Sequence, residues 1–325
     1  MKPKILVTRE VFDDTLAFLA QTCEVESNQA DKAFSPEELA RRLADKDGAV
    51  CCLTDAIDAK LLAASPSLKA VSNVAVGYNN IDVGACTAHG VMVTNTPGVL
   101  DDSTADFAWA LLMAAARRVA ELDATIRAGH WAHWQLKQWM GIDVHGATLG
   151  IIGMGRIGQA IAKRAIGFDM PVLYCNRTRL GVDVEKRLNA TWVTKDKLLA
   201  RADFVVLQLP YSNETHHLIG AAELATMKPS SILINTARGG VIDDTALVEA
   251  LSAGRIRAAG LDVFEGEPKL HPGFLSLKNA VIAPHVASST EATRARMAMT
   301  AAKNLVAALT GATPPNLLNP TARNT

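Results

Sequence analysis

The sequence contains no apolar run long enough to cross a membrane. The longest, Phe107–Ala116, is flanked by charged residues and has about half of the roughly 20 residues that a bilayer-spanning helix needs. The apolar N-terminal segment Ile5–Val7 turns polar at once, so it is too short for a signal-peptide core and is typical of a first β-strand. These features predict a protein that acts away from membranes.

An excess of charge is also missing. Lys plus Arg and Asp plus Glu each number 33, so the formal net charge is zero. This balance argues against nucleic acid or an anionic membrane as a partner bound through bulk charge. The 325 residues are 49% hydrophobic and 20% charged, as in folded globular proteins. At about 150 residues per domain, the length predicts two domains.

Cysteine is scarce. The five cysteines, an odd number, form neither a CxxC motif nor a Cys/His metal-binding spacing, so no metal site is expected. Cys51 and Cys52 lie in the apolar run Ala49–Leu53, which favours buried thiols over redox chemistry. Together these features indicate a reducing compartment and predict a cytoplasmic protein.

The first third of the chain alternates apolar runs with helical patterns. Helical periodicity covers Val11–Ala20 and Glu37–Leu43, the second with Ser35 and Pro36 as cap and first-turn proline. Alternating strands and helices indicate βαβ units and a mostly parallel sheet. The predicted strands are Lys4–Thr8, Ala49–Leu53, Ala70–Val74 and Val91–Thr94.

The middle and the end of the chain contain less regular segments. A long helix is predicted from Ser103 to about Ala128, with Gly129 as its C-terminal stop. The next segment, His130–Trp139, holds three of the five tryptophans; it is either an ordered loop packed on the protein itself or part of an interface. The residues from Thr313 onward are expected to form a tail.

A second α/β series begins near Thr148. Six strands with helical patterns between them are the number in a full dinucleotide-binding sheet. They are Thr148–Ile152, Pro171–Cys175, Phe204–Leu209, Ser231–Thr236, Ala258–Phe264 and Ala280–Ala283.

The first of these strands leads into the glycine motif Gly153-Met154-Gly155-Arg156-Ile157-Gly158, which opens a helical pattern. In this GxGxxG context Gly153 permits a tight turn, Gly155 lets the backbone approach a pyrophosphate, and Gly158 lets helix and strand pack closely. The helix N-terminus supplies N–H groups to the phosphates. The motif predicts dinucleotide binding.

The residues after the second strand of this series bear on which dinucleotide is bound. An NAD-type site has an acidic residue about 20 positions after the glycines, but here the segment is Asn176-Arg177-Thr178-Arg179, with Asn176 at the expected position. Arg177 and Arg179 can bind a 2′-phosphate as bidentate donors, or they are solvated surface groups. The pattern favours NADPH over NADH, with NADH still possible.

Three residues of functional type follow three successive strands: Arg238, Glu267 and His285. In open α/β sheets the ligand crevice lies outside the carboxyl ends of the strands, so these side chains should converge there. Any one of them is as readily an ordinary surface group. Their order at matching strand ends favours a joint site.

This combination fits reduction of a ketone by hydride transfer from a nicotinamide. A protonated His285 can give a proton to the carbonyl oxygen. Glu267 beside it would favour the charged ring and orient it. Arg238 can hold a substrate carboxylate and polarise the adjacent carbonyl.

Nearly the whole chain resembles the D-isomer-specific 2-hydroxyacid dehydrogenases. Besides the glycine motif, the resemblance is carried by residues 76–82, Leu209-Pro210, residues 235–240, residues 260–264 and residues 284–288. It implies that Arg238, Glu267 and His285 are catalytic and that the backbone of Val76 and Gly77 binds the substrate carboxylate, although Gly77–Asn80 is also compatible with an ordinary turn. Further cofactor contacts implied by the resemblance are Thr104, Arg156, Ile157, Pro210, Ala237 and Asp262, the last of which is alternatively a structural residue.

The resemblance also implies an architecture. It is α/β, with two doubly wound parallel-sheet domains: a Rossmann coenzyme domain (residues 100–289) inserted in a discontinuous, flavodoxin-like substrate domain (residues 1–99 and 290–325). A homodimer is expected, joined through the coenzyme domain with the helix near residues 103–128. The tryptophan segment would then be interfacial, with Trp134 or Trp139 near the neighbouring active site; packing on its own subunit is the alternative.

Within this family the chain is most similar to glyoxylate/hydroxypyruvate reductases and bacterial 2-ketogluconate reductases. The expected activity is NADPH-dependent reduction of glyoxylate, hydroxypyruvate or 2-keto-D-gluconate to the D-2-hydroxy acid. One alternative is an NAD(P)H-sensing, corepressor-like binding protein, since a fold does not determine function. Another is a dehydrogenase of the same fold that acts on a different 2-hydroxy acid.

Overall fold

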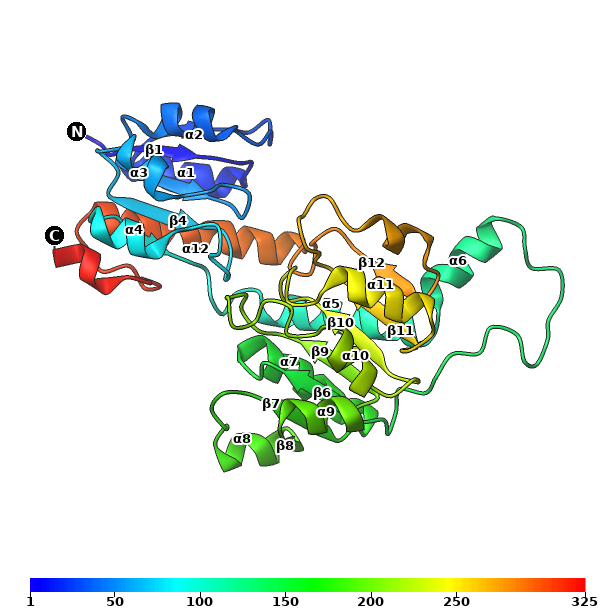
Figure 1. Cartoon of the computed structure of the whole chain (residues 1–325). Coiled ribbons are helices and arrows are strands. Elements are labelled where there is room, and N and C mark those ends of the chain that lie inside the picture. Colours follow the sequence, from blue (N-terminus) through cyan, green and yellow to red (C-terminus); the bar gives the residue numbers. More distant parts are fainter. Residues whose placement is uncertain (325) are drawn as a thin grey trace. The chain divides into compact units, whose positions relative to one another are not determined.

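The computed structural model describes residues 1–324 and divides into two compact units (Figure 1). Unit 1 comprises Met1–Leu100 and the chain from Ser289 on, and unit 2 is the intervening Asp101–Ser288. Unit 1 is therefore discontinuous in sequence. Among the described residues, no helix is both long and apolar enough to span a membrane.

Unit 1 contains a five-stranded parallel sheet in the order β2-β1-β3-β4-β5. This is the doubly wound order of flavodoxin-like folds. The strands are β1 (Lys4–Val7), β2 (Glu24–Ser27), β3 (Gly48–Cys51), β4 (Ala70–Asn73) and β5 (Met92–Thr94). The helices are α1 (Asp13–Thr22), α2 (Pro36–Leu43), α3 (Ala59–Ala63), α4 (Val83–Ala88) and α12 (Glu291–Leu309), followed by a 3₁₀ turn, η3 (Pro320–Asn324).

The four strands predicted in this part of the chain are confirmed, and the Ser35 cap is confirmed too, since its hydroxyl accepts a hydrogen bond from the Glu38 N–H. Strand β2 was not predicted. The expectation of a C-terminal tail is wrong for Leu318 and Asn319. The Leu318 N–H donates to the Val93 carbonyl, and the Asn319 side chain accepts from the Val93 N–H, so the segment packs along β5.

Unit 2 contains a seven-stranded parallel sheet in the order β12-β11-β10-β9-β6-β7-β8. The order reverses beside β6, which makes this a doubly wound Rossmann sheet with one additional strand. The strands are β6 (Leu149–Ile152), β7 (Val172–Cys175), β8 (Ala190–Trp192), β9 (Phe204–Leu207), β10 (Ile232–Asn235), β11 (Ala258–Leu261) and β12 (Ala280–Ile282). The six predicted strands are confirmed, and β8 was missed. The predicted fold class, two doubly wound parallel-sheet α/β domains, is thus confirmed.

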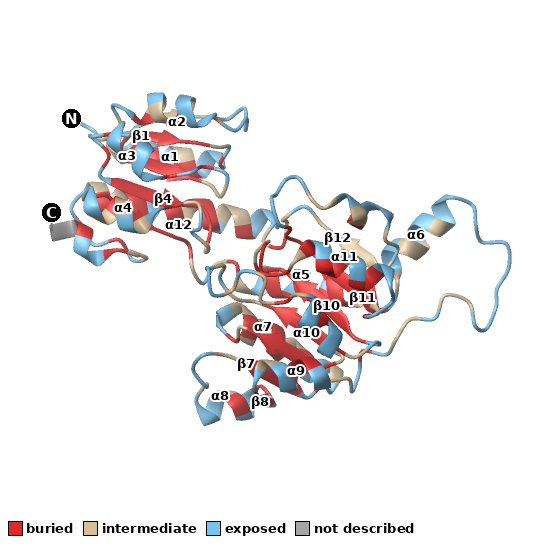
Figure 2. Cartoon of the chain, viewed as in Figure 1, coloured by how far each residue is buried: buried red, intermediate tan, exposed pale blue. Residues whose placement is uncertain are grey.

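Helices lie along both faces of this sheet, and the central strands are buried (Figure 2). The helices of unit 2 are α5 (Asp101–Ala116), α6 (Val119–Arg127), α7 (Arg156–Ala165), α8 (Val182–Arg187), α9 (Lys195–Arg201), α10 (Ala221–Thr226) and α11 (Asp244–Ser252), with short 3₁₀ segments η1 (Ile166–Phe168) and η2 (Pro272–Ser276). Of these, α6 extends away from the sheet (Figure 1).

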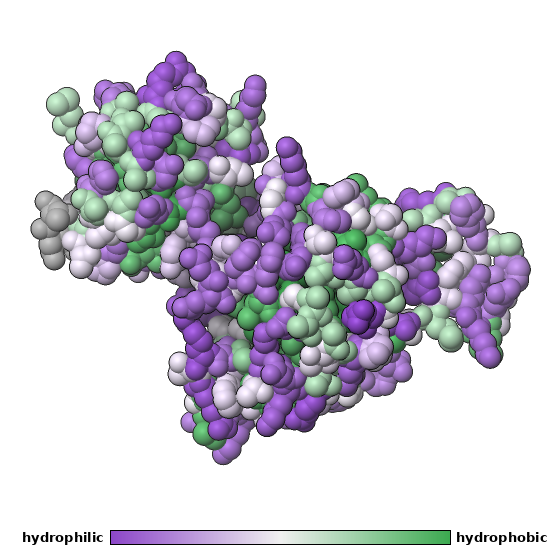
Figure 3. Space-filling view, viewed as in Figure 1, coloured by the Kyte–Doolittle hydropathy of each residue, from purple (hydrophilic) through white to green (hydrophobic). Residues whose placement is uncertain are grey.

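The prediction of one helix over residues 103–128 is wrong, because the chain breaks between α5 and α6. Arg118 adopts a left-handed φ of 58°, and the Ala116 carbonyl at the end of α5 accepts a hydrogen bond from the Ile142 N–H instead of continuing the helix. None of the residues of α6 is buried. Residues 117–140, called the arm below, extend from the body of unit 2 and expose interspersed hydrophobic and hydrophilic side chains (Figure 3).

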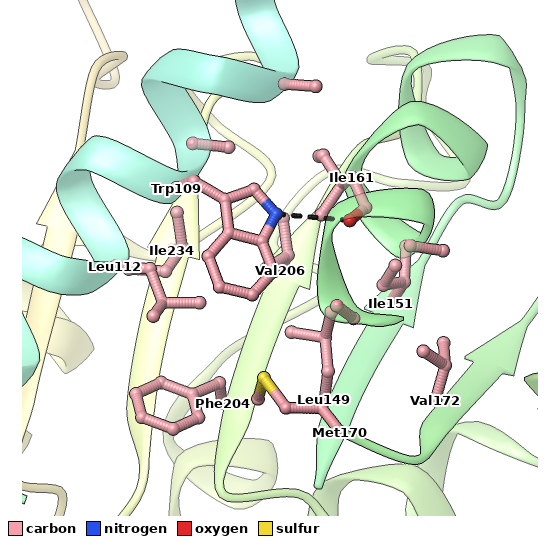
Figure 4. Close-up of a cluster of buried hydrophobic side chains, with 14 of the residues drawn as sticks. Trp109, Leu112, Leu149, Ile151, Ile161, Met170, Val172, Phe204, Val206 and Ile234 are labelled. Carbon is pink, nitrogen blue, oxygen red and sulfur yellow. Dashed lines mark hydrogen bonds between the residues drawn. The ribbon is translucent and has the colours of Figure 1, made fainter. Parts of the chain in front are cut away.

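The core between α5, α7 and the sheet holds the Rossmann helices in place (Figure 4). Trp109 of α5 is 7% exposed. Its indole N–H donates to the Ile161 carbonyl of α7 at 3.1 Å, and its ring stacks on Phe168 with the centroids 4.6 Å apart. Because buried indoles need a partner for the N–H group, this bond orients α5 against the helix that follows the glycine motif.

Candidate active site

The glycine motif forms the turn from β6 into α7, next to the point where the strand order reverses. Gly153 has a φ of +101°, and a Cβ on it would collide with the carbonyl of Gln208, which follows β9. A Cβ on Gly158 would in turn collide with the Gly153 carbonyl, whereas the space beside Gly155 is open. The backbone of β6, β9 and α7 can approach this closely only with glycine at Gly153 and Gly158. Gly155 is the N-cap of α7, so the open space beside it lies at the helix N-terminus, an arrangement suited to a phosphate.

Asn176 lies at the carboxyl end of β7, where the sequence indicated the residue that selects the cofactor. Its side-chain oxygen accepts a hydrogen bond from the Met154 N–H at 2.6 Å. Asn176 therefore braces the glycine turn from the neighbouring strand. A neutral amide at this position brings no negative charge toward a bound ribose.

The two arginines that follow differ in their surroundings. The Arg177 side chain is 92% exposed, and its nearest carboxylate, Glu214, lies at 3.7 Å. Arg179 instead forms two hydrogen bonds with Glu185, at 2.9 and 2.8 Å. This bidentate pairing leaves Arg177 as the arginine of the two that is open to a ligand.

The carboxylate of Glu185 is the centre of a small polar network. It also accepts a hydrogen bond from the hydroxyl of Tyr174, a fully buried residue of β7, at 2.7 Å. Hydrogen bonds from Arg179 and Tyr174 lower the pKa of Glu185 to about 2. The sequence indicated Arg179 as a possible phosphate ligand, but the structure gives it a structural partner.

Arg238, Glu267 and His285 follow the adjacent strands β10, β11 and β12. The three side chains line a single cavity of about 260 Å³ within unit 2. The structure thus brings together the three residues that the sequence pattern indicated. The remaining lining residues are Tyr211, Gly239, Gly240, Phe264, Glu265 and Gly266.

His285 and Glu267 form the closest pair in this cavity. Nδ1 of His285 lies 2.8 Å from Oε2 of Glu267, and Oε1 of Glu267 accepts the Phe264 N–H at 2.8 Å. Burial alone would raise the pKa of Glu267. The hydrogen bonds from His285 and Phe264 and the nearby charges outweigh it, so the pKa lies below its usual value. The carboxylate is therefore ionised at neutral pH, and Nε2 is left as the ring nitrogen of His285 for a substrate.

Arg238 lies on the turn after β10, which a buried asparagine holds in shape. The Asn235 side chain donates to the Arg238 carbonyl and accepts from the Ala237 N–H, both at 3.0 Å. Burial lowers the pKa of the guanidinium and Glu267 opposes this, yet an arginine keeps its charge in proteins. A largely desolvated cation at this position can bind a carboxylate strongly.

Asp262 holds the segment that carries His285. Its two carboxylate oxygens accept the N–H groups of Val286 and Ala287, each at 2.8 Å, and its carbonyl accepts the His285 N–H. His285 itself has a left-handed φ of 55°, a conformation that costs energy in a non-glycine residue and so needs such support. The sequence indicated Asp262 as a cofactor contact or a structural residue, and these bonds give it a positioning role.

Several residues at this site have no sequence signal that marks them as functional. Tyr211 lines the cavity, and Asn235 shapes the arginine turn. Asp244, at the start of α11, accepts the Glu265 N–H at 3.0 Å. Burial raises its pKa to about 6. An acidic residue at a helix start is typical of a cap, so no local signal marked Asp244 as an anchor for the loop that holds Glu267.

The remaining predicted site residues are distributed over both units. In unit 1 the loop after β4 is held by side-chain amides: Asn95 donates to the Val76 carbonyl at 2.8 Å and Asn73 to the Gly77 carbonyl at 2.9 Å. In unit 2 the predicted cofactor contacts lie on α5 and α7 and in the segments after β7, β9 and β10. They are Thr104, Arg156, Ile157, Thr178, Pro210 and Ala237.

Known proteins are similar to this chain over nearly its whole length. Residues 109–287 match the family described as "D-isomer specific 2-hydroxyacid dehydrogenase, NAD binding domain". A glyoxylate reductase of Thermococcus onnurineus is 48% identical over 323 residues, which cover 98% of this chain and 96% of that protein.

Two solved structures are similar at comparable coverage. A glyoxylate reductase from Paecilomyes thermophila is 32% identical with a TM-score of 0.88, covering 98% of each chain. An NADPH-dependent glyoxylate/hydroxypyruvate reductase from Sinorhizobium meliloti, in complex with NADP and malonate, is 31% identical with a TM-score of 0.87, covering 99% of this chain and 98% of that one.

Proposed function

Because the chain belongs to the D-isomer specific 2-hydroxyacid dehydrogenase family, we propose that it reduces a small 2-keto acid to the D-2-hydroxy acid with NADPH. Glyoxylate, hydroxypyruvate and 2-keto-D-gluconate are the proposed substrates. The observation that carries the proposal is the 2.8 Å hydrogen bond between His285 and Glu267 in a cavity that Arg238 also lines. A proton donor, its anionic partner and a carboxylate-binding cation are the groups that this reduction requires.

In this mechanism each residue has one task. Arg238 binds the substrate carboxylate and polarises the adjacent carbonyl. Nε2 of His285 gives its proton to the carbonyl oxygen, and Glu267 holds the ring through Nδ1 and stabilises the positive charge. Asp262 keeps the His285 backbone in place. The nicotinamide cofactor, when bound, supplies the hydride for the carbonyl carbon.

The chain also offers a fitting site for that cofactor. The open space beside Gly155, at the N-terminus of α7, accommodates a pyrophosphate where a side chain on glycine would intrude. For NADPH over NADH, we rely on the neutral Asn176 and the exposed Arg177, which can pair with a 2′-phosphate. The similar Sinorhizobium meliloti structure holds NADP, which supports this choice.

The test is the initial rate of NADPH and NADH oxidation with each of the three keto acids. Faster turnover with NADPH supports both the reaction and the Arg177 site, and the ranking of the acids identifies the substrate. Turnover with NADH alone keeps the reaction and overturns the cofactor preference. Saturable NADPH binding without turnover on any keto acid would overturn the proposal in favour of a sensing protein.

We further propose a homodimer in the cytoplasm. The arm exposes large apolar side chains, and such surfaces on a folded protein mark sites of association. Trp131, Trp134, Leu136 and Met140 are 55%, 74%, 78% and 60% exposed. All five cysteines are free thiols, which is in keeping with a reducing compartment.

A further inference from the structure

Two consecutive histidines and a glutamate form a cluster beside the cavity. His216 and His217 lie between β9 and α10, and Glu265 lies in the loop after β11. One ligand atom from each of the three residues lies within 4.8 Å of the others. Because Glu265 is 48 residues from His217, the three residues show no metal-binding spacing in the sequence.

Neighbouring oxygen groups surround the two imidazole rings. Nδ1 of His216 lies 3.2 Å from the Tyr211 hydroxyl, and Nδ1 of His217 faces the Asp243 carboxylate at 4.0 Å. Nε2 of His217 lies 3.1 Å from Oε2 of Glu265. Nδ1 of His216 thus has an outer oxygen partner, as metal-binding histidines usually do. The two rings stack with their centroids 3.8 Å apart, so a shared ion requires the rings to turn apart and bring both Nε2 atoms toward Glu265.

The distance between His217 and Glu265 suits two ligands of a transition metal. Ligands that lie about 2.0–2.1 Å from a tetrahedral Zn²⁺ are separated by about 3.3 Å, close to the 3.1 Å between His217 and Glu265. The His217 and Glu265 side chains are 35% and 45% exposed, so a metal could enter from solvent and keep a water as its fourth ligand. Two imidazoles and one carboxylate favour zinc over the hard cations magnesium and calcium.

We propose that His216, His217 and Glu265 form a binding site for Zn²⁺ at the rim of the cavity. Tyr211, which supports His216, and Glu265 itself both line that cavity. Glu265 is two residues from Glu267, so ligation of Glu265 pulls on the turn that orients His285. Bound zinc therefore slows keto-acid reduction. This effect on rate rests on the proposed function, whereas the binding site does not.

Zinc binding is measured directly, by competition with a chromogenic chelator at neutral pH on the full chain. The expected result is saturable binding of one Zn²⁺ per chain that His216→Gln weakens at least about tenfold. Glu265→Gln gives a second variant if His216→Gln does not fold, as judged by circular dichroism. Equal binding by wild type and both variants overturns the proposal, as does a wild-type protein that binds no Zn²⁺.

Two control variants exclude other sites. His133→Gln removes an exposed histidine of the arm, and His285→Gln removes the histidine of the cavity; both are expected to bind Zn²⁺ as the wild type does. Loss of binding in either control would place the metal there and overturn the proposal. In a separate assay, zinc should inhibit keto-acid reduction by the wild type and fail to inhibit the His216→Gln variant. Without any reductase activity, the chelator assay still decides the metal site.

Discussion

Among single residues, Glu267 is the one whose charge the proposed chemistry uses most directly. We expect Glu267→Gln to lower kcat for keto-acid reduction about 100-fold, near the lower end of the range for general acid–base groups. The amide can still accept the 2.8 Å hydrogen bond from His285 but carries no charge to stabilise the imidazolium. Steady-state kinetics with the best keto acid measure this effect.

The affinity for NADPH serves as the control for that variant. Glu267 contacts His285 and the Phe264 N–H and lies outside the glycine turn, so a titration of tryptophan fluorescence with NADPH should give wild-type affinity. If kcat stays within about twofold of wild type, Glu267 has no part in the chemistry. An equal loss of NADPH affinity would indicate a disturbed fold instead.

Arg177 is the second residue with a specific predicted role; its exposed guanidinium lies 3.7 Å from Glu214. Arg177→Ala should raise the KM for NADPH about tenfold, since a charge-assisted bond to phosphate contributes about 1.5 kcal/mol or more, and leave the KM for NADH unchanged. Glu214→Gln should lower the KM for NADPH, because it removes a negative charge beside the phosphate. Both changes should fade in high salt, as expected for exposed charges.

The control for this pair is Arg187→Ala, which removes an exposed arginine of the nearby α8. It should leave both KM values as in the wild type. Equal changes in the KM for NADPH and NADH after Arg177→Ala would mean that Arg177 does not read the 2′-phosphate.

Between elements, Asp244 links the start of α11 to the loop after β11 that carries Glu265 and Glu267. Burial, together with the charges of Glu265 and Asp243, raises its pKa to about 6, with the Glu265 N–H and His271 opposing. A raised pKa in the folded state means that the stability from this group is present at low pH and is lost as the pH rises from about 4 to about 6.

Asp244→Asn removes the cost of ionising a buried carboxyl group, and its side-chain oxygen should still accept the Glu265 N–H. The quantity of interest is the free energy of unfolding of the variant minus that of the wild type. We expect this difference to be larger by about 1–2 kcal/mol at weakly alkaline pH than at acidic pH. Urea unfolding of both proteins at about pH 4 and pH 8 measures this difference. Asp183→Asn, on the exposed α8, supplies the comparison, and an unchanged difference between the two pH values would contradict the burial argument.

Most strands, but not all of them, could be predicted from the sequence. Most strands were predictable because they are short apolar runs, and the carboxyl ends of three of them, β10, β11 and β12, placed Arg238, Glu267 and His285. Strand β2, with the sequence Glu-Val-Glu-Ser, and strand β8 lie at sheet edges. An edge strand is covered on fewer sides and needs no apolar run. Such a strand is recognised by its hydrogen bonds to the neighbouring strand, and the local sequence does not show which segments will pair.

Contacts that depend on the folded geometry could not be predicted from local sequence patterns. The end of α5 is set by the Ile142 N–H binding the Ala116 carbonyl, and the commitment of Arg179 is set by Glu185. Alanine is compatible with the interior of the predicted long helix, and arginine with the predicted phosphate site. What decided their roles was a partner brought near by the fold. The glycine turn could therefore be predicted in detail, and the arginine proposed to bind a phosphate only as one of two candidates.

For the whole molecule, we predict that the arm, through its exposed apolar side chains, determines whether the proposed homodimer forms. Trp134 and Leu136 are 74% and 78% exposed, and in the proposed homodimer they become buried. The double variant Trp134→Ala, Leu136→Asp should cost the dimer about 3 kcal/mol, or about a hundredfold in dissociation constant. Sedimentation velocity over a range of concentrations should then show a dimer for the wild type and mainly monomer for the variant. Leu275→Asp, at a leucine that is 71% exposed outside the arm, should remain a dimer. Monomeric wild-type protein, or a variant as dimeric as the wild type, would contradict the role of the arm.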